Sequence, residues 1–224
     1  MKYLSNIVLT LFLMLMAESG FASDWKGKIG ITPTAGAMIP SNGSFDNHGD
    51  LKDVVETGQN WGVSVRYGIT TNLAVEGSFS YSWMYVVDSE KPEADLDPAY
   101  VMPSIIFGIV YKFDPFINLK FSRNISPFVS LGLGLHPWKF SNDGVSGTVV
   151  AAKYQSEDEF SKTSFGMNVG AGAEYSISKN LSVSGQGKYY FVFSEDEEKF
   201  GANFDNQGFI GLDFSLTYYL PLRK

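Results

Sequence analysis

The segment Tyr67-Gly-Ile-Thr-Thr-Asn-Leu-Ala-Val-Glu-Gly77 decides the fold, because it recurs 108 positions later as Tyr175-Ser-Ile-Ser-Lys-Asn-Leu-Ser-Val-Ser-Gly185. Tyr, Ile, Asn, Leu, Val and Gly occupy the same offsets in both copies, and large aromatic residues follow at alternate positions. Each copy reads as a strand, a three-residue turn and a second strand, with one apolar face and one polar face. A hairpin of this kind, used twice, indicates a membrane-spanning β-barrel.

The first 22 residues read as a secretory signal peptide. Lys2 precedes an apolar stretch from Ile7 to Ala17, and Gly20-Phe-Ala22 places small residues three and one before the expected cleavage site. A single membrane anchor is the alternative, although the stretch is short for a transmembrane helix, which needs about 20 residues. We therefore expect a signal peptide over residues 1–22 and one barrel domain over residues 23–224. The chain has no cysteine, so a closed ladder of backbone hydrogen bonds has to take the place of disulfides.

Eight segments alternate between large apolar residues and small or polar ones, and each is expected to be a strand. They span about residues 28–39, 61–69, 73–85, 104–112, 129–136, 164–175, 181–193 and 210–220. The even count, with short and long connections in turn, predicts an all-β fold, an eight-stranded antiparallel up-and-down transmembrane barrel. Pro137 is expected to make a bulge in the fifth strand, because proline cannot donate to a ladder. A soluble lipocalin-like barrel is the alternative, since periodicity alone does not say which face lies inside.

Aromatic residues on the apolar faces gather at both ends of the predicted barrel. The end with short turns at 70–72 and 178–180 carries tyrosines that would form a girdle at one membrane interface: Tyr67, Tyr111, Tyr175 and Tyr218. The end with long connections (about 40–58, 88–99, 141–163 and 194–207) carries an outer rim of Trp61, Trp83, Tyr85 and Trp138. Those connections hold 18 of the 23 acidic residues that follow residue 22. Because outer-membrane barrels place short turns in the periplasm, we expect the acidic end to face outside the cell.

Five charged side chains fall on the small-residue faces and would line the lumen: Arg66, Glu76, Glu174, Lys188 and Asp213, with His136 a further candidate. Arg66 and Glu76 lie five residues on either side of the turn centre at 71, so they are expected to pair across one hairpin. Glu174 and Lys188 lie unequally about the centre at 179, which makes Asp213 a candidate partner. An isolated buried charge costs several kcal/mol, and an eight-stranded interior is just wide enough for side chains to fill. The charges are therefore expected to form one interior network, which acts either as a salt-bridged plug or as a gate whose ion pairs exchange.

The hairpins and glycine-rich strands resemble the small outer-membrane barrel superfamily, which includes outer membrane protein W and the opacity-type and OmpA-like barrels. The matching segments are Ile31-Thr-Pro-Thr-Ala-Gly36, Tyr67–Glu76, Ser126-Pro-Phe-Val-Ser-Leu-Gly-Leu-Gly134 and Ala173–Leu181. The resemblance implies the outer membrane of a Gram-negative bacterium, with outer-membrane lipid, lipopolysaccharide and the barrel-assembly machinery as partners. It also implies a porin-like, non-enzymatic role, such as a conduit for small hydrophobic molecules.

Other classes of function find less support in the sequence. Neither His48 nor His136 opens the His-x-Ser motif of lipid A deacylases, so no catalytic residue is assigned, and a lipid A-modifying enzyme is the third alternative. Acidic clusters such as Glu195-Asp-Glu-Glu198 match no calcium-loop spacing, so neither a metal nor a cofactor is expected. The net charge of -7 argues against a nucleic-acid partner. A structural or adhesive surface protein without transport is the main alternative to a conduit.

The assigned orientation predicts where protease cuts intact cells. Once lipopolysaccharide is truncated, cleavage is expected near Glu93, Glu157 or Glu197, because long loops face outside the cell. Mass spectrometry of the fragments maps the cuts, and cells with a permeabilised outer membrane provide the control. Cuts confined to residues 70–72 and 178–180 of intact cells would reverse the orientation.

Overall fold

The computed structural model of the protein describes residues 24–44, 50–87, 98–113, 124–142, 145–146, 161–195 and 205–221. The strands are β1 Lys28–Asn42, β2 Gly58–Gly68, β3 Leu73–Tyr85, β4 Pro98–Lys112, β5 Ile125–Asn142, β6 Val145–Ser146, β7 Ser161–Ser176, β8 Leu181–Val192 and β9 Gln207–Pro221. A one-turn helix, α2 Leu51–Val54, lies between β1 and β2. No helix within the described ranges is long and apolar enough to cross a bilayer. The expected signal peptide, His48 and the acidic clusters at 88–97 and 157–159 lie outside the described residues.

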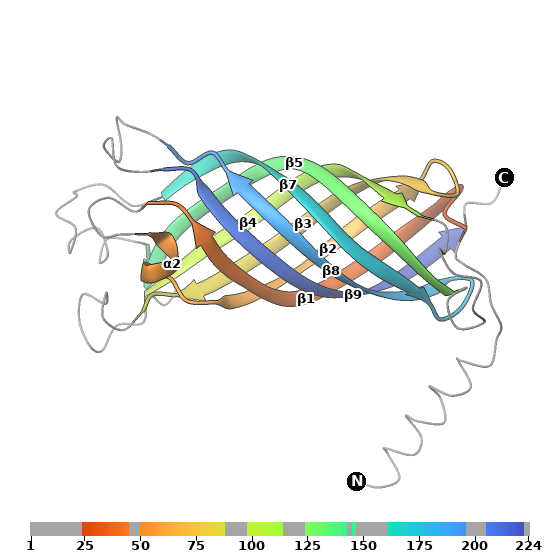
Figure 1. Ribbon diagram of the computed structural model, residues 1–224, viewed down its shortest axis with the longest axis horizontal. Coiled ribbons are helices and arrows are strands. Elements are labelled where there is room, and N and C mark those ends of the chain that lie inside the picture. The colour runs from red at the N-terminus through yellow and green to blue at the C-terminus, as the bar shows by residue number, and fades with distance from the viewer. Residues whose placement is uncertain are drawn as a thin grey trace, which may run out of the picture.

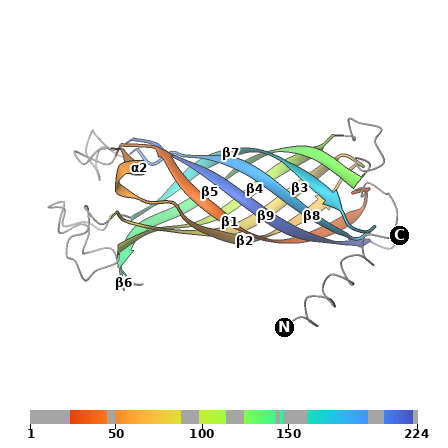
Figure 2. The same ribbon diagram turned by 60° about the horizontal axis from the view of Figure 1, so that its bottom comes forward.

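Eight of these strands close into one antiparallel barrel, as Figure 1 shows. Successive barrel strands pair along the chain, β1 pairs with β9 to close the wall, and the short β6 pairs only with the tip of β5. In Figures 1 and 2, α2 lies at one end, while β1 begins and β9 ends at the other. We call these the loop end and the short-turn end. The eight-stranded up-and-down barrel predicted from the sequence is confirmed, and most strands run farther toward the loop end than predicted.

The apolar faces of the strands point outward and the polar faces point inward. Phe214 and Phe107 are 77% and 71% exposed on the outer wall, whereas Asp213 and Arg66 are 3% and 7% exposed. Along β9 the two environments alternate almost without interruption from Phe209 to Leu220. This placement excludes the lipocalin-like alternative, in which the aromatic face would fill the core.

Small residues on the inner faces let the wall curve tightly. A Cβ at Gly36 would lie 2.1 Å from the carbonyl oxygen of Leu212, and one at Gly108 would lie 2.3 Å from that of Leu131. Both glycines therefore allow backbone approaches that any side chain would block. The space left by small residues is taken up by the long side chains that fill the lumen.

The expected bulge at Pro137 is wrong. Val101 faces Lys139 and Ile105 faces Leu135, so the register of β4 on β5 is the same on both sides of the proline. Between these pairs, residues 102–104 of β4 form no ladder pairs with residues 136–138 of β5, although both segments pair with their other neighbouring strands. Pro103 occupies the position that faces Pro137, and neither proline has an N–H to donate. The ladder is interrupted here without any shift of register, and we call this interruption the proline seam.

Candidate functional site in the barrel interior

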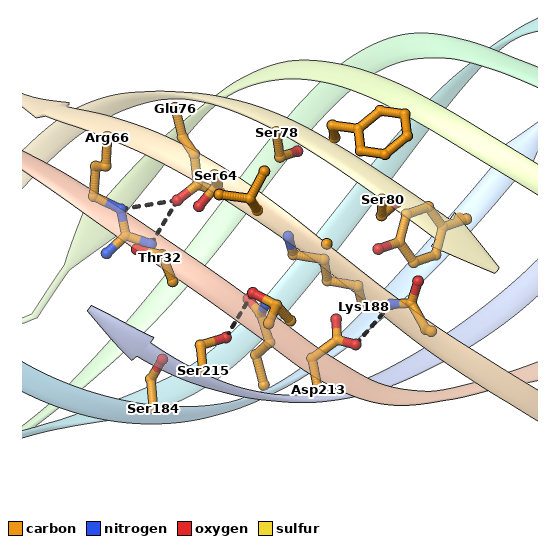
Figure 3. Close-up of a pocket in the computed structure, with 17 residues that line it drawn as sticks. Thr32, Ser64, Arg66, Glu76, Ser78, Ser80, Ser184, Lys188, Asp213 and Ser215 are labelled. Carbon is orange, nitrogen blue, oxygen red and sulfur yellow. Dashed lines mark hydrogen bonds and ion pairs between the residues drawn. The ribbon is translucent and has the colours of Figure 1, made fainter. Parts of the chain in front are cut away.

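The predicted charge network lies near the short-turn end of the lumen. Arg66 Nε and Nη2 donate to Glu76 Oε2 at 2.9 and 2.7 Å, and Arg66 Nη1 donates to Glu174 Oε2 at 3.5 Å. Figure 3 shows the first pair across neighbouring strands. Arg66 and Glu76 face each other in the β2–β3 register, as their equal distance from the turn predicts. Glu174 also accepts a hydrogen bond from the hydroxyl of Tyr219 at 2.8 Å, so the network ties together β2, β3, β7 and β9.

Trp25 seals this network at the short-turn end, and sequence reasoning missed it. Its indole Nε1 donates to Glu174 Oε1 at 3.4 Å, and its ring centroid lies 4.9 Å from Arg66 Cζ and 4.4 Å from Lys112 Nζ. The ring is 1% exposed. Such cation–π contacts are stronger when they are desolvated. Because Trp25 precedes the first strand, it belongs to no alternating pattern that would have singled it out.

Lys188 and Asp213 lie in the middle of the lumen, beside the Arg66 network, and take no part in its ion pairs. Asp213 Oδ1 accepts a hydrogen bond from Asn60 Nδ2 at 2.7 Å, and Asn60 Oδ1 accepts one from Ser82 Oγ at 3.1 Å. Lys188 and Asp213 line one small cavity of about 30 Å³ with Glu76 (Figure 3). The ion pairs between described residues include neither Lys188 with Glu174 nor Lys188 with Asp213. A cavity of this volume holds about two water molecules, so the described lumen has no open channel at this level.

Apolar side chains fill the loop end of the lumen. We call this set the loop-end cluster: Met38, Leu51, Val54, Val55, Met84, Val86, Tyr100, Met102, Ile106, Trp138, Phe140, Tyr190, Val192 and Phe209. Tyr100 is at its centre, with ring centroids 5.9 Å from Trp138, 5.1 Å from Phe140 and 5.6 Å from Phe209. Leu51 and Val54 come from α2, which therefore covers the cluster from the loop side.

His136 is also in the lumen, fully buried beside the loop-end cluster. Its Nδ1 lies 2.8 Å from Ser104 Oγ, and its Nε2 has no hydrogen-bond partner among the described residues. Both side chains are buried, at 0% and 1% exposure. Within the described ranges, no group of three or more His, Asp or Glu residues is placed to hold a metal ion. The interior chemistry is therefore that of a packed core with one ion network.

The predicted tyrosine girdle lies on the outer wall near the short-turn end. Tyr67, Tyr111 and Tyr218 are 43%, 43% and 50% exposed, and Tyr175 is part-buried in the same outward set. At the loop end, Trp61 and Tyr85 point outward at 53% and 48% exposure, and ring contacts of 5.2 to 6.4 Å link Trp61, Tyr81, Trp83 and Tyr85.

Trp138 does not belong with the other residues assigned to the outer rim. It is 2% exposed, stacks on Tyr100 inside the barrel and donates from Nε1 to Ser164 Oγ at 3.1 Å. It occupies an even-numbered position of β5, and the even positions from Phe128 to Phe140 are all buried. The expectation that Trp138 lies on the outward rim is therefore corrected.

A larger cavity of about 670 Å³ lies at the loop end, against the outer side of the proline seam. We call it the wall cavity. Its lining comes from β3, β4, β5 and β7: Tyr81, Val101, Pro103, Pro137, Trp138, Lys139, Ser161, Lys162 and Thr163. Trp138 thus belongs both to the loop-end cluster inside and to the lining of a cavity outside.

The fold and its lumen define a class, the closed outer-membrane β-barrels whose interior is filled by side chains. The family model for the outer membrane protein beta-barrel domain matches residues 7–218, and the protein belongs to this family. It is an outer-membrane protein.

Solved structures support the fold at low sequence identity. Neisserial surface protein A is 17% identical with a TM-score of 0.54, over 86% of this chain and 97% of its own. The attachment invasion locus protein Ail of Yersinia pestis, in complex with the heparin analogue sucrose octasulfate, is 14% identical with a TM-score of 0.52, over 87% and 99%. OprG from Pseudomonas aeruginosa is 12% identical with a TM-score of 0.52, over 90% and 100%. No match is found among curated protein sequences.

The network predicts that Arg66 cannot be removed alone without a large loss of stability. Arg66→Gln leaves two buried carboxylates without their cation, which should cost about 3–5 kcal/mol of unfolding free energy. Glu76→Gln should cost less because Arg66 keeps Glu174, and the triple change to Gln at all three positions should cost less than Arg66→Gln. Urea unfolding in detergent, followed by tryptophan fluorescence and gel mobility, measures each loss.

The exposed pair Lys52–Asp50, 3.0 Å apart, provides the control. Lys52→Gln should leave the unfolding midpoint unchanged, because both side chains are about half exposed. Losses at Arg66 and Glu76 that simply add in the double variant would mean that the two side chains do not stabilise each other.

Proposed function

We propose that the protein is a conduit for small apolar molecules, which leave the lumen sideways through the proline seam. The observation that carries this proposal is the position of Trp138. Its ring packs inside the loop-end cluster, and the same residue lines the wall cavity outside. Trp138 therefore lies between an apolar interior and an apolar-lined cavity, at the place where the ladder is interrupted.

The two halves of the lumen differ in what they admit. The loop-end cluster offers an apolar solute contacts like those of a protein core. The short-turn half holds the Arg66 network, and a small polar cavity of about 30 Å³ lies beside it in the middle of the lumen. An ion would have to leave water and disrupt paired buried charges there, which costs several kcal/mol. The arrangement therefore supports passage of apolar molecules through the wall at the loop end. It does not support passage of ions along the barrel axis.

The segment around α2 covers the entrance that such a solute would use. Val55 forms an antiparallel bridge with Val86, flanked by hydrogen bonds from Glu56 N to Tyr85 O at 2.8 Å and from Val87 N to Val54 O at 2.9 Å. This short contact and the α2 side chains connect the segment to β3, and Leu51 N donates to Gly43 O at 2.6 Å on the β1 side. A displacement of α2 would expose the loop-end cluster.

A structural or adhesive role without transport is the second candidate. The packing of the described lumen favours it, because the space beside the Arg66 network is a cavity of only about 30 Å³. The acidic loops would then meet cations bound to lipopolysaccharide or a host surface. A lipid A-modifying activity has weaker support, since Ser104 and His136, which contact each other, are buried in the lumen.

The conduit predicts a gain of flux when Trp138 is truncated. In liposomes that carry the protein, Trp138→Ala should raise uptake of the neutral dye N-phenyl-1-naphthylamine several-fold, because the ring that fills the path is gone. Potassium flux should stay at the level of protein-free liposomes in both proteins, because the Arg66 network is intact. Fluorescence of the dye and a potassium electrode measure the two fluxes.

Trp61→Ala is the matched control, because Trp61 is an outward-facing tryptophan at 53% exposure that takes no part in the loop-end cluster. Its dye uptake should equal that of the unchanged protein. Equal rises in dye and potassium flux for Trp138→Ala would indicate a non-specific leak. Dye uptake at the protein-free level in every variant would contradict the conduit and favour the structural or adhesive role.

The cover formed by α2 can be locked in place, because the chain has no native cysteine. The flanking hydrogen bonds make Val55 and Val86 a non-hydrogen-bonded pair, for which the Cα atoms lie about 4.5 Å apart, within disulfide range. Val55→Cys with Val86→Cys should abolish dye uptake when oxidised and restore it on reduction. Either single cysteine variant is the control. Equal dye uptake by the oxidised and the reduced double variant would exclude this entrance.

A further inference from the structure

The wall cavity lies where the outer surface of the barrel changes from apolar to polar. On β5 the outward residues Leu131, Leu133 and Leu135 are 47–52% exposed, and Pro137 and then Lys139 follow toward the loop end. On β7 the outward Phe165 is followed by Thr163 and Ser161, which face Pro137 and Lys139. In a lipid-facing wall, such a change marks the boundary between hydrocarbon and headgroups. The cavity therefore spans that boundary.

Lys139 lies at the loop-end side of this cavity, where headgroups are expected, and the apolar residues of the lining lie toward the short-turn end. It faces Val101 on β4 and Ser161 on β7, and its side chain is part-buried on the outward face. None of the ion pairs between described residues involves Lys139. A lysine in this position can lay its methylene stem on apolar surface and hold its ammonium among headgroups.

A second cation lies close by and is anchored to the barrel. Lys162 also lines the cavity, and its ammonium donates to the backbone carbonyls of Glu195 at 3.0 Å and Ser194 at 3.4 Å. These contacts fix the Lys162 ammonium on the β8 side of β7, and the described lining of the cavity contains no Asp or Glu. The lining is thus basic at an end of the molecule whose loops are strongly acidic.

We propose that the wall cavity binds a phosphorylated lipid of the surrounding leaflet, with an acyl chain against Val101, Pro103 and Pro137 and the phosphate at Lys139. The volume of about 670 Å³ is within the range of small-molecule sites. An acyl chain fills the apolar part, and an anionic headgroup meets the cation at the level where a bilayer places phosphates. In the expected orientation this leaflet is the outer one, whose phosphate-bearing lipid is the lipid A part of lipopolysaccharide.

This inference stands apart from the conduit, because a bound lipid requires neither a path through the lumen nor displacement of α2. In this proposal a lipid chain, and not a transported solute, packs against the outer side of the proline seam, where β4 and β5 do not pair. A barrel that transports nothing could still hold this lipid. The two ideas are therefore tested by different measurements.

The test is a binding titration of the folded full-length barrel in detergent by native mass spectrometry. The probes are diphosphoryl lipid A, the same glycolipid without its phosphates, and inorganic phosphate. Diphosphoryl lipid A should bind most tightly, and inorganic phosphate should not bind at the same concentrations. Lys139→Gln should weaken binding of diphosphoryl lipid A about fivefold, the effect of one cation near a membrane surface, and should leave the dephosphorylated lipid unchanged.

Two further variants complete the experiment. Lys52→Gln, an exposed lysine at the same end that is paired with Asp50, should bind as the unchanged protein does. Thr163→Trp places a large side chain in the cavity from an exposed position and should weaken both lipids. Gel mobility confirms that each variant is folded. Equal binding of the two lipids, equal effects of the two lysine changes, or full binding by Thr163→Trp would each overturn the assignment.

Discussion

The closed ladder of backbone hydrogen bonds is the constraint on which the rest of this structure depends. A strand that crosses hydrocarbon has no water to satisfy its N–H and C=O groups, so every strand must pair on both sides. Pairing of β1 with β9 meets this requirement and removes the edges that an open sheet would leave. Closure at eight strands also fixes the width of the lumen. A lumen of that width is filled by side chains, and the inner residues must therefore be chosen to pack.

The packing divides the lumen into two parts with opposite chemistry. Toward the short turns, Arg66 forms ion pairs with two carboxylates, those of Glu76 and Glu174. Trp25 and Tyr219 donate hydrogen bonds to Glu174. Toward the loops, aromatic and aliphatic side chains pack around Tyr100 with α2 above them. The ion network stabilises one register of four strands, because it requires particular residues to face one another. The apolar cluster is less specific, since apolar contacts are non-directional and can re-form around a different partner. The ion network and the apolar cluster are thus separate parts of one lumen.

The sequence predicted what depends on local spacing and missed what depends on long connections. The hairpin turns at 71 and 179 bring Arg66 opposite Glu76, and strict alternation places Asp213 inside and Tyr218 outside. The sequence also predicts one lumen network that includes Arg66 and Glu174, but not their direct contact, because their strands are 108 residues apart along the chain. Trp25 and α2 lie outside the alternating segments, so the apolar–polar periodicity gives no prediction for them. Pro103 meets Pro137 through the register of β4 on β5, and the sequence between these strands is too long for a turn type to fix that register.

The position of the proline seam follows from the cost of a missing backbone hydrogen bond, because this cost depends on depth in the membrane. Deep in hydrocarbon, an unpaired backbone group costs several kcal/mol, whereas at the interface water and headgroups can compensate. The two prolines face each other where the outer wall passes from Leu135 and Phe165 to Lys139 and Ser161, so the defect falls where it is tolerated. Beside the defect stand an apolar ring inside, Trp138, and a cation outside, Lys139. A weak point in the ladder, an apolar core behind it and a cavity in front of it make this the part of the wall where a lipid-soluble molecule and the barrel can meet.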